Sequence, residues 1–132
     1  MTHEGIEKIK HDVLAASQRW IANFNAGDVD SCVAAYTSHA IMHATPMGTF
    51  TGSQEIAGFW RPFMNSGATG LVYRNIDLQV VDDSTVLLSA DWSMNVGRGI
   101  ITMEKWVKQE DGQWRLEQDD FEVQEQFGIP NE

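Results

Sequence analysis

The sequence has little cysteine and little positive charge. Cys32 is the single cysteine, which excludes an internal disulfide, and its apolar neighbours favour a small core residue over a nucleophile. Nine Lys and Arg residues stand against 19 Asp and Glu residues, so the formal net charge is −10. A surface with this charge repels phosphate backbones and anionic lipids. We therefore expect neither a nucleic acid nor a membrane as a partner.

Long hydrophobic runs are also missing. The longest uncharged stretches are too short and too polar to span a bilayer. The first residues, MTHEGIEKIKHD, lack the apolar segment of a signal peptide. These absences, together with the lone cysteine, predict a soluble protein of the cytoplasm.

Motifs that bind cofactors and metals are absent as well. The sequence contains no phosphate-binding glycine loop, nucleophile elbow or nucleotide fingerprint, so no cofactor is expected. Neither a carboxylate nor a second histidine stands at ligand spacing from His43, so no metal site is expected either.

What is present is the composition of one globular domain, and we expect it to span residues 1–132. Hydrophobic residues make up 42% of the chain and charged residues 21%. Apolar residues at spacings of three and four predict an amphipathic helix over about His3 to Asn25. Asp28 can cap a short second helix. The buried side of this second helix is expected to hold Val29, Cys32, Val33 and Tyr36.

The stretch from Ala40 to Arg61, AIMHATPMGTFTGSQEIAGFWR, predicts a strand, a kinked loop and a helix. The strand is expected over 40–43, and Pro46 and Gly48 break it. Gly52 then ends the loop, and Ser53 is the expected cap of the helix. The buried stripe of that helix is expected to hold Ile56, Phe59, Trp60 and Phe63.

From Gly70 onward the sequence alternates and is rich in β-branched and aromatic residues, which is typical of strands. Four strands are expected near Gly70–Val81, Ser84–Asn95, Gly99–Glu110 and Gln113–Gln126. Helices followed by a run of antiparallel strands predict an α+β fold in which the helices cover one face of a curved sheet.

Several motifs carry a resemblance to a known superfamily. The run QRWIANFNAGDVDSCVAAYTSHAIMHATPMG closely resembles the amino-terminal half of Δ5-3-ketosteroid isomerase, and the whole arrangement resembles SnoaL-like, nuclear-transport-factor-2-like domains. This resemblance implies a cone-shaped, cystatin-like roll with three amino-terminal helices on a strongly curved, mostly antiparallel sheet. It also implies a pocket at the open end and a dimer formed through the sheet.

The resemblance does not extend to all functional positions of the isomerase. Where the isomerase has an oxyanion-holding tyrosine, this chain has Trp20, whose indole N–H donates one hydrogen bond and is no acid. The place of its general base is taken by Thr45, or by Ala44 in an ungapped count from Gly27. The third group, a protonated aspartate, is matched in kind by Glu104. Steroid isomerisation by that mechanism is therefore not expected.

His43 is the first candidate for a general base, because imidazole titrates near neutrality. Whether it reaches the pocket depends on strand parity. If the Thr45 side of the strand faces the pocket, His43 does too, whereas the count ending at Ala44 points it outward. Both alternatives remain open from the sequence.

Glu104 is the second candidate. It shares a strand face with Ile100, Thr102 and Trp106, where a carboxylate is costly unless it is paired or neutral. In the opposite register, Met103 is inside and Glu104 is on the surface. Arg98 and Lys105 are the expected neighbours that neutralise Glu104 or bind an anion.

Asp119 and Asp120 on the last expected strand are further candidates. Strict alternation puts Trp114, Leu116, Gln118 and Asp120 on one face. A bulge brings in Asp119 and Phe121 instead. The resemblance to SnoaL-like cyclases implies that an aspartate of this strand is a catalytic acid or base.

Five tryptophans and six phenylalanines supply a large apolar lining for the expected pocket. The expected wall residues are Trp20, Phe24, Tyr36, Met47, Phe59, Trp60, Phe63 and Trp106.

Two hypotheses follow. In the first, the chain is a cofactor-independent isomerase, cyclase or dehydratase that moves a proton on an apolar carbonyl compound, with His43 as base and Glu104, Asp119 or Asp120 as acid. In the second, it is a non-catalytic module that binds a small hydrophobic molecule or only forms dimers. Both hypotheses include a homodimer through the outer face of the sheet, because its long amphipathic strands expose apolar surface.

Overall fold

A computed structural model describes residues 2–127, so residues 1 and 128–132 of the expected domain lie outside the described part. The described chain has the predicted α+β fold, with three helices and one six-stranded sheet. The helices are α1 (His3–Asn25), α2 (Val29–Ala34) and α3 (Gly52–Asn65). The strands are β1 (Tyr36–Thr45), β2 (Gly48–Thr51), β3 (Val72–Asp82), β4 (Thr85–Met94), β5 (Gly97–Lys108) and β6 (Trp114–Gln126).

The long first helix follows its predicted bounds. The Thr2 hydroxyl accepts a hydrogen bond from the Gly5 N–H at 3.0 Å and so caps the amino end of α1. Its buried residues Val13, Trp20 and Phe24 come from the predicted apolar stripe. The chain leaves the helix through Gly27, whose φ of 76° is one that glycine adopts without strain. Asp28 then caps α2, as predicted, by accepting from the Ser31 N–H.

The region around β1 and β2 differs from the prediction in three ways. Tyr36 begins β1 and is not part of α2. Residues Gly48–Thr51, expected as loop, form the short strand β2, because they pair antiparallel with β1 across the tight turn at Pro46. The cap of α3 is Thr51 and not Ser53, and its N–H donates to the Glu55 carboxylate at 2.9 Å.

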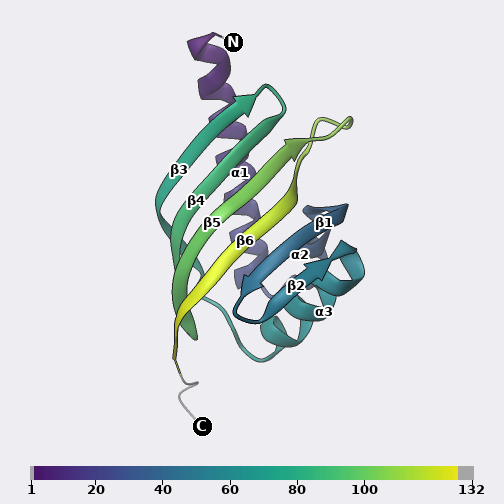
Figure 1. The fold of residues 1–132 in the computed structure, drawn as a ribbon, viewed down its shortest axis with the longest axis vertical. Coiled ribbons are helices and arrows are strands. Elements are labelled where there is room, and N and C mark those ends of the chain that lie inside the picture. The colour runs from purple at the N-terminus through teal and green to yellow at the C-terminus, as the bar shows by residue number, and fades with distance from the viewer. Residues whose placement is uncertain (1, 128–132) are drawn as a thin grey trace.

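The sheet has the order β2-β1-β6-β5-β4-β3. All neighbouring pairs in this described sheet are antiparallel except β1 with β6, which run parallel. Figure 1 shows α1 behind the long curved strands β3 to β6, while α2 and α3 lie near β1 and β2. The parallel pairing sets the first strand of the chain beside the last, so residues far apart in sequence meet in the core.

Bulges interrupt the pairing of β5 and β6. The register shifts between Ile101 and Met103, and again between Lys105 and Trp106. Each bulge adds one residue to one strand, which moves the following side chains to the other face. These shifts decide which acidic residues lie inside.

No helix within residues 2–127 combines the length and the apolar character that crossing a membrane requires.

Candidate active site

A cavity of about 370 Å³ lies between the helices and the concave side of β3 to β6. The helices contribute aromatic rings, the sheet contributes aromatic and aliphatic side chains, and polar residues are few. The lining consists of Trp20, Met47, Phe59, Trp60, Phe63, Ser66, Leu71, Tyr73, Trp92, Met94, Val96, Gly97, Ile101, Asp119, Phe121, Val123, Gln126 and Phe127. Such a lining suits a small ligand with an apolar, ring-containing body.

Asp119 is the acidic residue of this lining. The bulge at Glu117 turns Asp119 and Phe121 inward, so the bulge alternative of the sequence prediction is the one found. The side chain is buried, at 4% exposure. Its Oδ2 accepts a hydrogen bond from the Tyr36 hydroxyl at 2.6 Å, and that hydroxyl accepts one from the Trp60 indole N–H at 3.2 Å. Its Oδ1 is buried and has no hydrogen-bond partner among residues 2–127.

Burial raises the pKa of Asp119 from 3.8 to about 7. The hydrogen bond from Tyr36 lowers this pKa, and the negative charge of Asp120 raises it, but both effects are smaller than that of burial. A carboxyl group with such a pKa exists in both protonation states near neutral pH. It can therefore take up a proton and give it back.

Glu104 is the other buried acid among residues 2–127, at 3% exposure. It stands opposite Asp119 in the β5–β6 pairing. Its Oε2 accepts from the Tyr73 hydroxyl at 2.7 Å and its Oε1 from the Trp106 indole N–H at 2.9 Å. Burial, followed by the charge of Asp119, raises the pKa of Glu104 to about 8.

Glu104 and Trp106 lie on the inner face, as the first alternative predicted, but Ile100 and Thr102 do not. The bulge after Ile101 lets Ile101 and Glu104 face the same side, three residues apart. The expected neutralising cations are paired elsewhere. Arg98 lies 3.5 Å from Glu125, and Lys105 lies 2.8 Å from Glu117.

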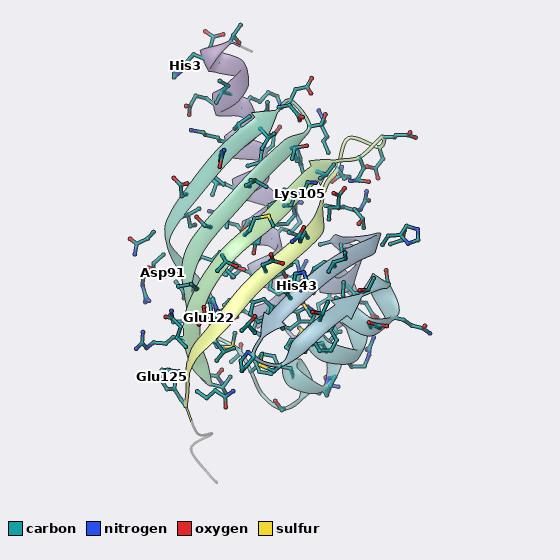
Figure 2. All side chains as sticks on the ribbon, in the orientation of Figure 1. His3, His43, Asp91, Lys105, Glu122 and Glu125 are labelled. Atoms are coloured by element: carbon teal, nitrogen blue, oxygen red, sulfur yellow. The ribbon has the colours of Figure 1, made fainter. Side chains whose placement is uncertain are left out.

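His43 lies on the outward side of β1. The buried residues of this strand include Ala40, Met42 and Ala44. The ungapped alignment, which matches Ala44 to the isomerase's base and points His43 outward, is therefore the correct alternative. The imidazole Nδ1 is 3.0 Å from the Thr49 hydroxyl, and Nε2 is 4.0 Å from Asp120 Oδ1. Figure 2 shows His43 on β1, beside β6. Neither His43 nor Asp120 is among the described residues that line the cavity. Both therefore lie outside the site that contains Asp119.

Three residues that were expected in the cavity wall do not line the cavity. Phe24 is fully buried behind the lining, where it packs on Trp20 and Trp60. Tyr36 lies behind Asp119 and holds its carboxylate. Trp106 borders a separate surface hollow near Arg19 and Trp114, and its indole bonds Glu104. The Trp20 ring lines the cavity, but its N–H is used by the Cys32 carbonyl at 3.1 Å.

The aromatic and aliphatic side chains that the sheet and the segments next to it contribute to the lining were not among the wall residues predicted from the sequence. These residues are Leu71, Tyr73, Trp92, Met94, Val96, Ile101, Phe121 and Val123, of which only Phe121 was considered as an alternative. Tyr73 carried one signal in the sequence, because the chain has only two tyrosines. In the structure each of them donates its hydroxyl proton to one of the two buried acids.

Residues 2–127 contain no group of three or more His, Cys, Asp or Glu side chains placed to hold a metal ion.

Comparison with known proteins agrees with this fold. The model of the SnoaL-like domain family matches residues 17–117. A comparison with curated proteins gave no match.

Solved structures with the same fold share little sequence. One is a Novosphingobium aromaticivorans protein provisionally named a scytalone dehydratase, with a TM-score of 0.84, 10% identity, and coverage of 99% of this chain and 94% of that one. Another is a Nostoc punctiforme protein of unknown function with a cystatin-like fold, with a TM-score of 0.73, 16% identity, and coverage of 92% of both chains. A third is a ketosteroid isomerase-like protein from Erwinia carotovora atroseptica, with a TM-score of 0.74, 12% identity, and coverage of 87% of this chain and 95% of that one. Identities this low establish the shared cystatin-like fold and leave the chemistry to the residues of the site.

Proposed function

Because the chain belongs to the SnoaL-like domain family, we propose that it binds a small apolar carbonyl compound and acts on it as a cofactor-independent isomerase, cyclase or dehydratase. One observation carries this proposal. Asp119 supplies the single carboxyl group of a described lining that is mostly aromatic and aliphatic, and one of its oxygens has no hydrogen-bond partner among residues 2–127. Such a group is placed to exchange a proton with a bound molecule.

The proposed step is proton transfer next to a carbonyl group. Asp119 in its ionised form takes a proton from the carbon beside the carbonyl through Oδ1, the C–H bond breaks, and its electron pair moves toward the carbonyl oxygen. The electron pair then returns from the oxygen while the protonated Asp119 gives up its proton. In an isomerisation a new C–H bond forms at another carbon; in a dehydration the C–O bond of a hydroxyl group on the next carbon breaks, a C=C bond forms, and the hydroxyl takes the proton and leaves as water. The Tyr36 hydroxyl occupies Oδ2, and Oδ1 has no partner among residues 2–127, so we assign the proton transfer to Oδ1.

The geometry does not support the ketosteroid isomerase arrangement. The Trp20 indole N–H is used within the core, and the strand residue Thr45 is exposed. His43 is left out of the proposed mechanism because its side chain lies outward.

The test uses a model ketone and does not require the natural substrate. The methyl protons of 2-acetylnaphthalene, an aromatic methyl ketone, exchange with D₂O when a base removes them, and proton NMR follows the loss of their signal. We expect the protein to accelerate this exchange and the Asp119→Asn variant to be slower by about a hundredfold or more, because general-base catalysis contributes that much.

The control is Glu117→Gln, which removes an exposed carboxylate from the same strand and should leave the rate unchanged. Exchange by Asp119→Asn at the rate of the unaltered protein would remove Asp119 from the mechanism. Binding of the ketone without any acceleration by the unaltered protein would favour the second hypothesis, a ligand-binding module without catalysis.

We also propose a homodimer formed through the outer face of the sheet. Several apolar side chains point to that face or to its edges and are only partly covered by the described chain. They are Ile41, Val72, Ile76, Leu87, Ile100, Met103 and Val107.

A further inference from the structure

Tyr73 is, like Asp119, a polar residue of the cavity lining that belongs to a tyrosine–carboxyl pair, but the two pairs are oriented in opposite ways. At Asp119 the carboxyl group lines the cavity and Tyr36 lies behind it. At Glu104 the tyrosine, Tyr73, lines the cavity and the carboxyl group lies behind. The ligand therefore meets one carboxyl group and one phenol, each backed by a partner of the other kind.

Contacts of the β3 backbone and of the hydroxyl group hold Tyr73 in place. The Asn25 side chain at the end of α1 bonds both the N–H and the C=O of Leu71, at 2.8 and 3.2 Å, which fixes the start of β3. Tyr73 then pairs with Trp92 of β4. Its hydroxyl reaches across to Glu104 of β5 at 2.7 Å. A phenol that is held at its backbone and at its hydroxyl group in this way is preorganised for a ligand.

Tyr73 and Asp119 lie at one place in the lining. Glu104 and Asp119 are direct partners in the antiparallel pairing, and side chains of such partners start about 5 Å apart. The polar atoms that a ligand offers to Tyr73 and to Asp119 must then lie close together in the ligand. A carbonyl oxygen and the C–H bond on the next carbon have this spacing.

We propose that the Tyr73 hydroxyl donates a hydrogen bond to the carbonyl oxygen of the ligand, while Glu104 acts as a positioning residue that accepts or frees the Tyr73 proton. This inference rests on the proposed function and specifies its substrate class, a ketone with an aromatic body whose acidic C–H is adjacent to the carbonyl group. When Asp119 removes the proton, the negative charge that develops on the carbonyl oxygen is stabilised by the Tyr73 O–H.

The direction of the Tyr73–Glu104 hydrogen bond depends on the charge of Glu104. When Glu104 is ionised, Tyr73 donates to it and has no proton left for a ligand. When Glu104 is neutral, its own O–H donates to the tyrosine oxygen, and the Tyr73 proton is free to point into the cavity. Burial raises the pKa of Glu104 to about 8, so the neutral form exists at neutral pH.

The groups that face Glu104 come from several elements. Asp119 on β6 adds negative charge, while Tyr73 on β3 and Trp106 on its own strand donate hydrogen bonds. Tyr36 on β1 stands near both acids, and burial raises its pKa and that of Tyr73 well above 10. Both tyrosines therefore keep their protons over the pH range in which Glu104 titrates.

The test compares two probes of the same shape, 2-acetylnaphthalene and 2-isopropenylnaphthalene, in which a CH₂ group replaces the carbonyl oxygen. Their dissociation constants are measured by quenching of tryptophan fluorescence at about pH 6 and about pH 9.5, on either side of the Glu104 pKa of about 8. We expect the unaltered protein to prefer the ketone by roughly tenfold at the lower pH, the usual worth of one hydrogen bond. The preference should fall at the higher pH.

Two variants test whether Tyr73 and Glu104 cause the preference for the ketone. Tyr73→Phe should bind the hydrocarbon as before and lose the preference for the ketone at both pH values. Glu104→Gln should keep the preference at both, because the amide N–H₂ donates to Tyr73 while the amide oxygen still accepts from Trp106. A general loss of folding would weaken the binding of both probes equally. The ratio of their two dissociation constants therefore reports the hydrogen bond alone.

A ketone preference that survives in Tyr73→Phe would overturn the role of Tyr73. A preference that still falls with pH in Glu104→Gln would assign the pH dependence to Asp119 and overturn the role of Glu104. Equal binding of both probes by the unaltered protein would contradict only this inference. Binding of neither would contradict the proposed aromatic ligand itself.

Discussion

At the scale of single residues, the chemistry of the site depends on how each carboxyl group is held. Asp119 receives one hydrogen bond from Tyr36 and leaves Oδ1 without a partner among residues 2–127. Glu104 receives hydrogen bonds on both oxygens, from Tyr73 and Trp106. The first arrangement suits a group that exchanges protons with a ligand, and the second suits a group that holds a neighbour in place.

The hydrogen bond between Tyr36 and Asp119 leads us to predict how the rate of ketone proton exchange depends on pH. The hydrogen bond from Tyr36 lowers the pKa of Asp119, so Tyr36→Phe should raise that pKa above about 7. Proton exchange that requires ionised Asp119 should then begin at higher pH. The measurement is the pH profile of ketone exchange, with a ¹³C NMR titration of the carboxyl group as support. An unchanged or lowered midpoint would contradict the assignment of Asp119 as the base.

At the scale of elements, β5 is shaped to let a large ring cross it. Trp92 of β4 extends over Gly97 and Gly99, and its indole N–H donates to the Glu122 carbonyl of β6 at 3.2 Å. The Trp92 ring lines the cavity. The absence of side chains at the two glycines therefore determines the position of this part of the cavity wall. A Cβ atom at Gly99 would overlap the Glu122 carbonyl oxygen and lie 2.9 Å from Trp92 Cζ2.

We therefore expect Gly99→Ala to destabilise the protein by about 3 kcal/mol or more, because β5 and β6 must separate to admit the methyl group. The variant should also bind 2-acetylnaphthalene more weakly, because Trp92 moves. Gly58→Ala is the matched control. Gly58 is exposed on α3, and its added Cβ would meet no atom within 4 Å, so this change should stabilise by about 0.5–1 kcal/mol. Urea unfolding measures both, and equal stability of the two variants would contradict the expectation.

At the scale of the whole molecule, the two buried acids make stability depend on pH. Their pKa values rise from 4.5 to about 8 for Glu104 and from 3.8 to about 7 for Asp119. Between pH 3.8 and about 7 for Asp119, and between pH 4.5 and about 8 for Glu104, the unfolded chain has mostly released the proton that the folded chain still holds. The folded state binds more protons, so its stability falls as the pH rises through this range.

Urea unfolding between about pH 5 and pH 9 should show the free energy of unfolding decreasing by an amount on the order of a few kcal/mol and then levelling off. Glu104→Gln and Asp119→Asn should each reduce the decrease, since each removes one titrating group. Glu117→Gln, which removes an exposed carboxylate, should leave it unchanged. Stability that rises with pH in the unaltered protein would show that these acids are ionised in the fold.

The proposed dimer makes a separate prediction at this scale. Sedimentation at micromolar concentration should give a species of twice the 14.8 kDa chain mass. Ile100→Lys and Met103→Lys, on the outer face of β5, should shift it toward the monomer, because each charge would be buried in the interface. A monomer at all concentrations up to that range would exclude the sheet-face dimer.

Features that depend on residues close together in the sequence could be predicted, whereas features that depend on distant residues could not. The amphipathic period of α1, the cap at Asp28 and the four long strands were predicted correctly, because local spacing and turn residues determine them. The family match over residues 17–117 confirms the SnoaL-like resemblance, and the three helices on a six-stranded sheet confirm the α+β fold that it implied. Tyr36, predicted as helical, begins a strand whose pairing with β6 is not visible locally.

The side to which each acid points was decided only by the tertiary structure. Side chains alternate along a strand, so one inserted residue moves all that follow to the other face. The bulges at Glu117 and after Ile101 brought Asp119 and Glu104 inside, and the parity of β1 sent His43 outward. Bulges depend on the partner strand, as do the bonds from Tyr36 and Tyr73, which lie 83 and 31 residues from the acids they hold. The sequence by itself determined which acids and aromatic rings were available, and the pairing of distant strands determined which of them share a cavity.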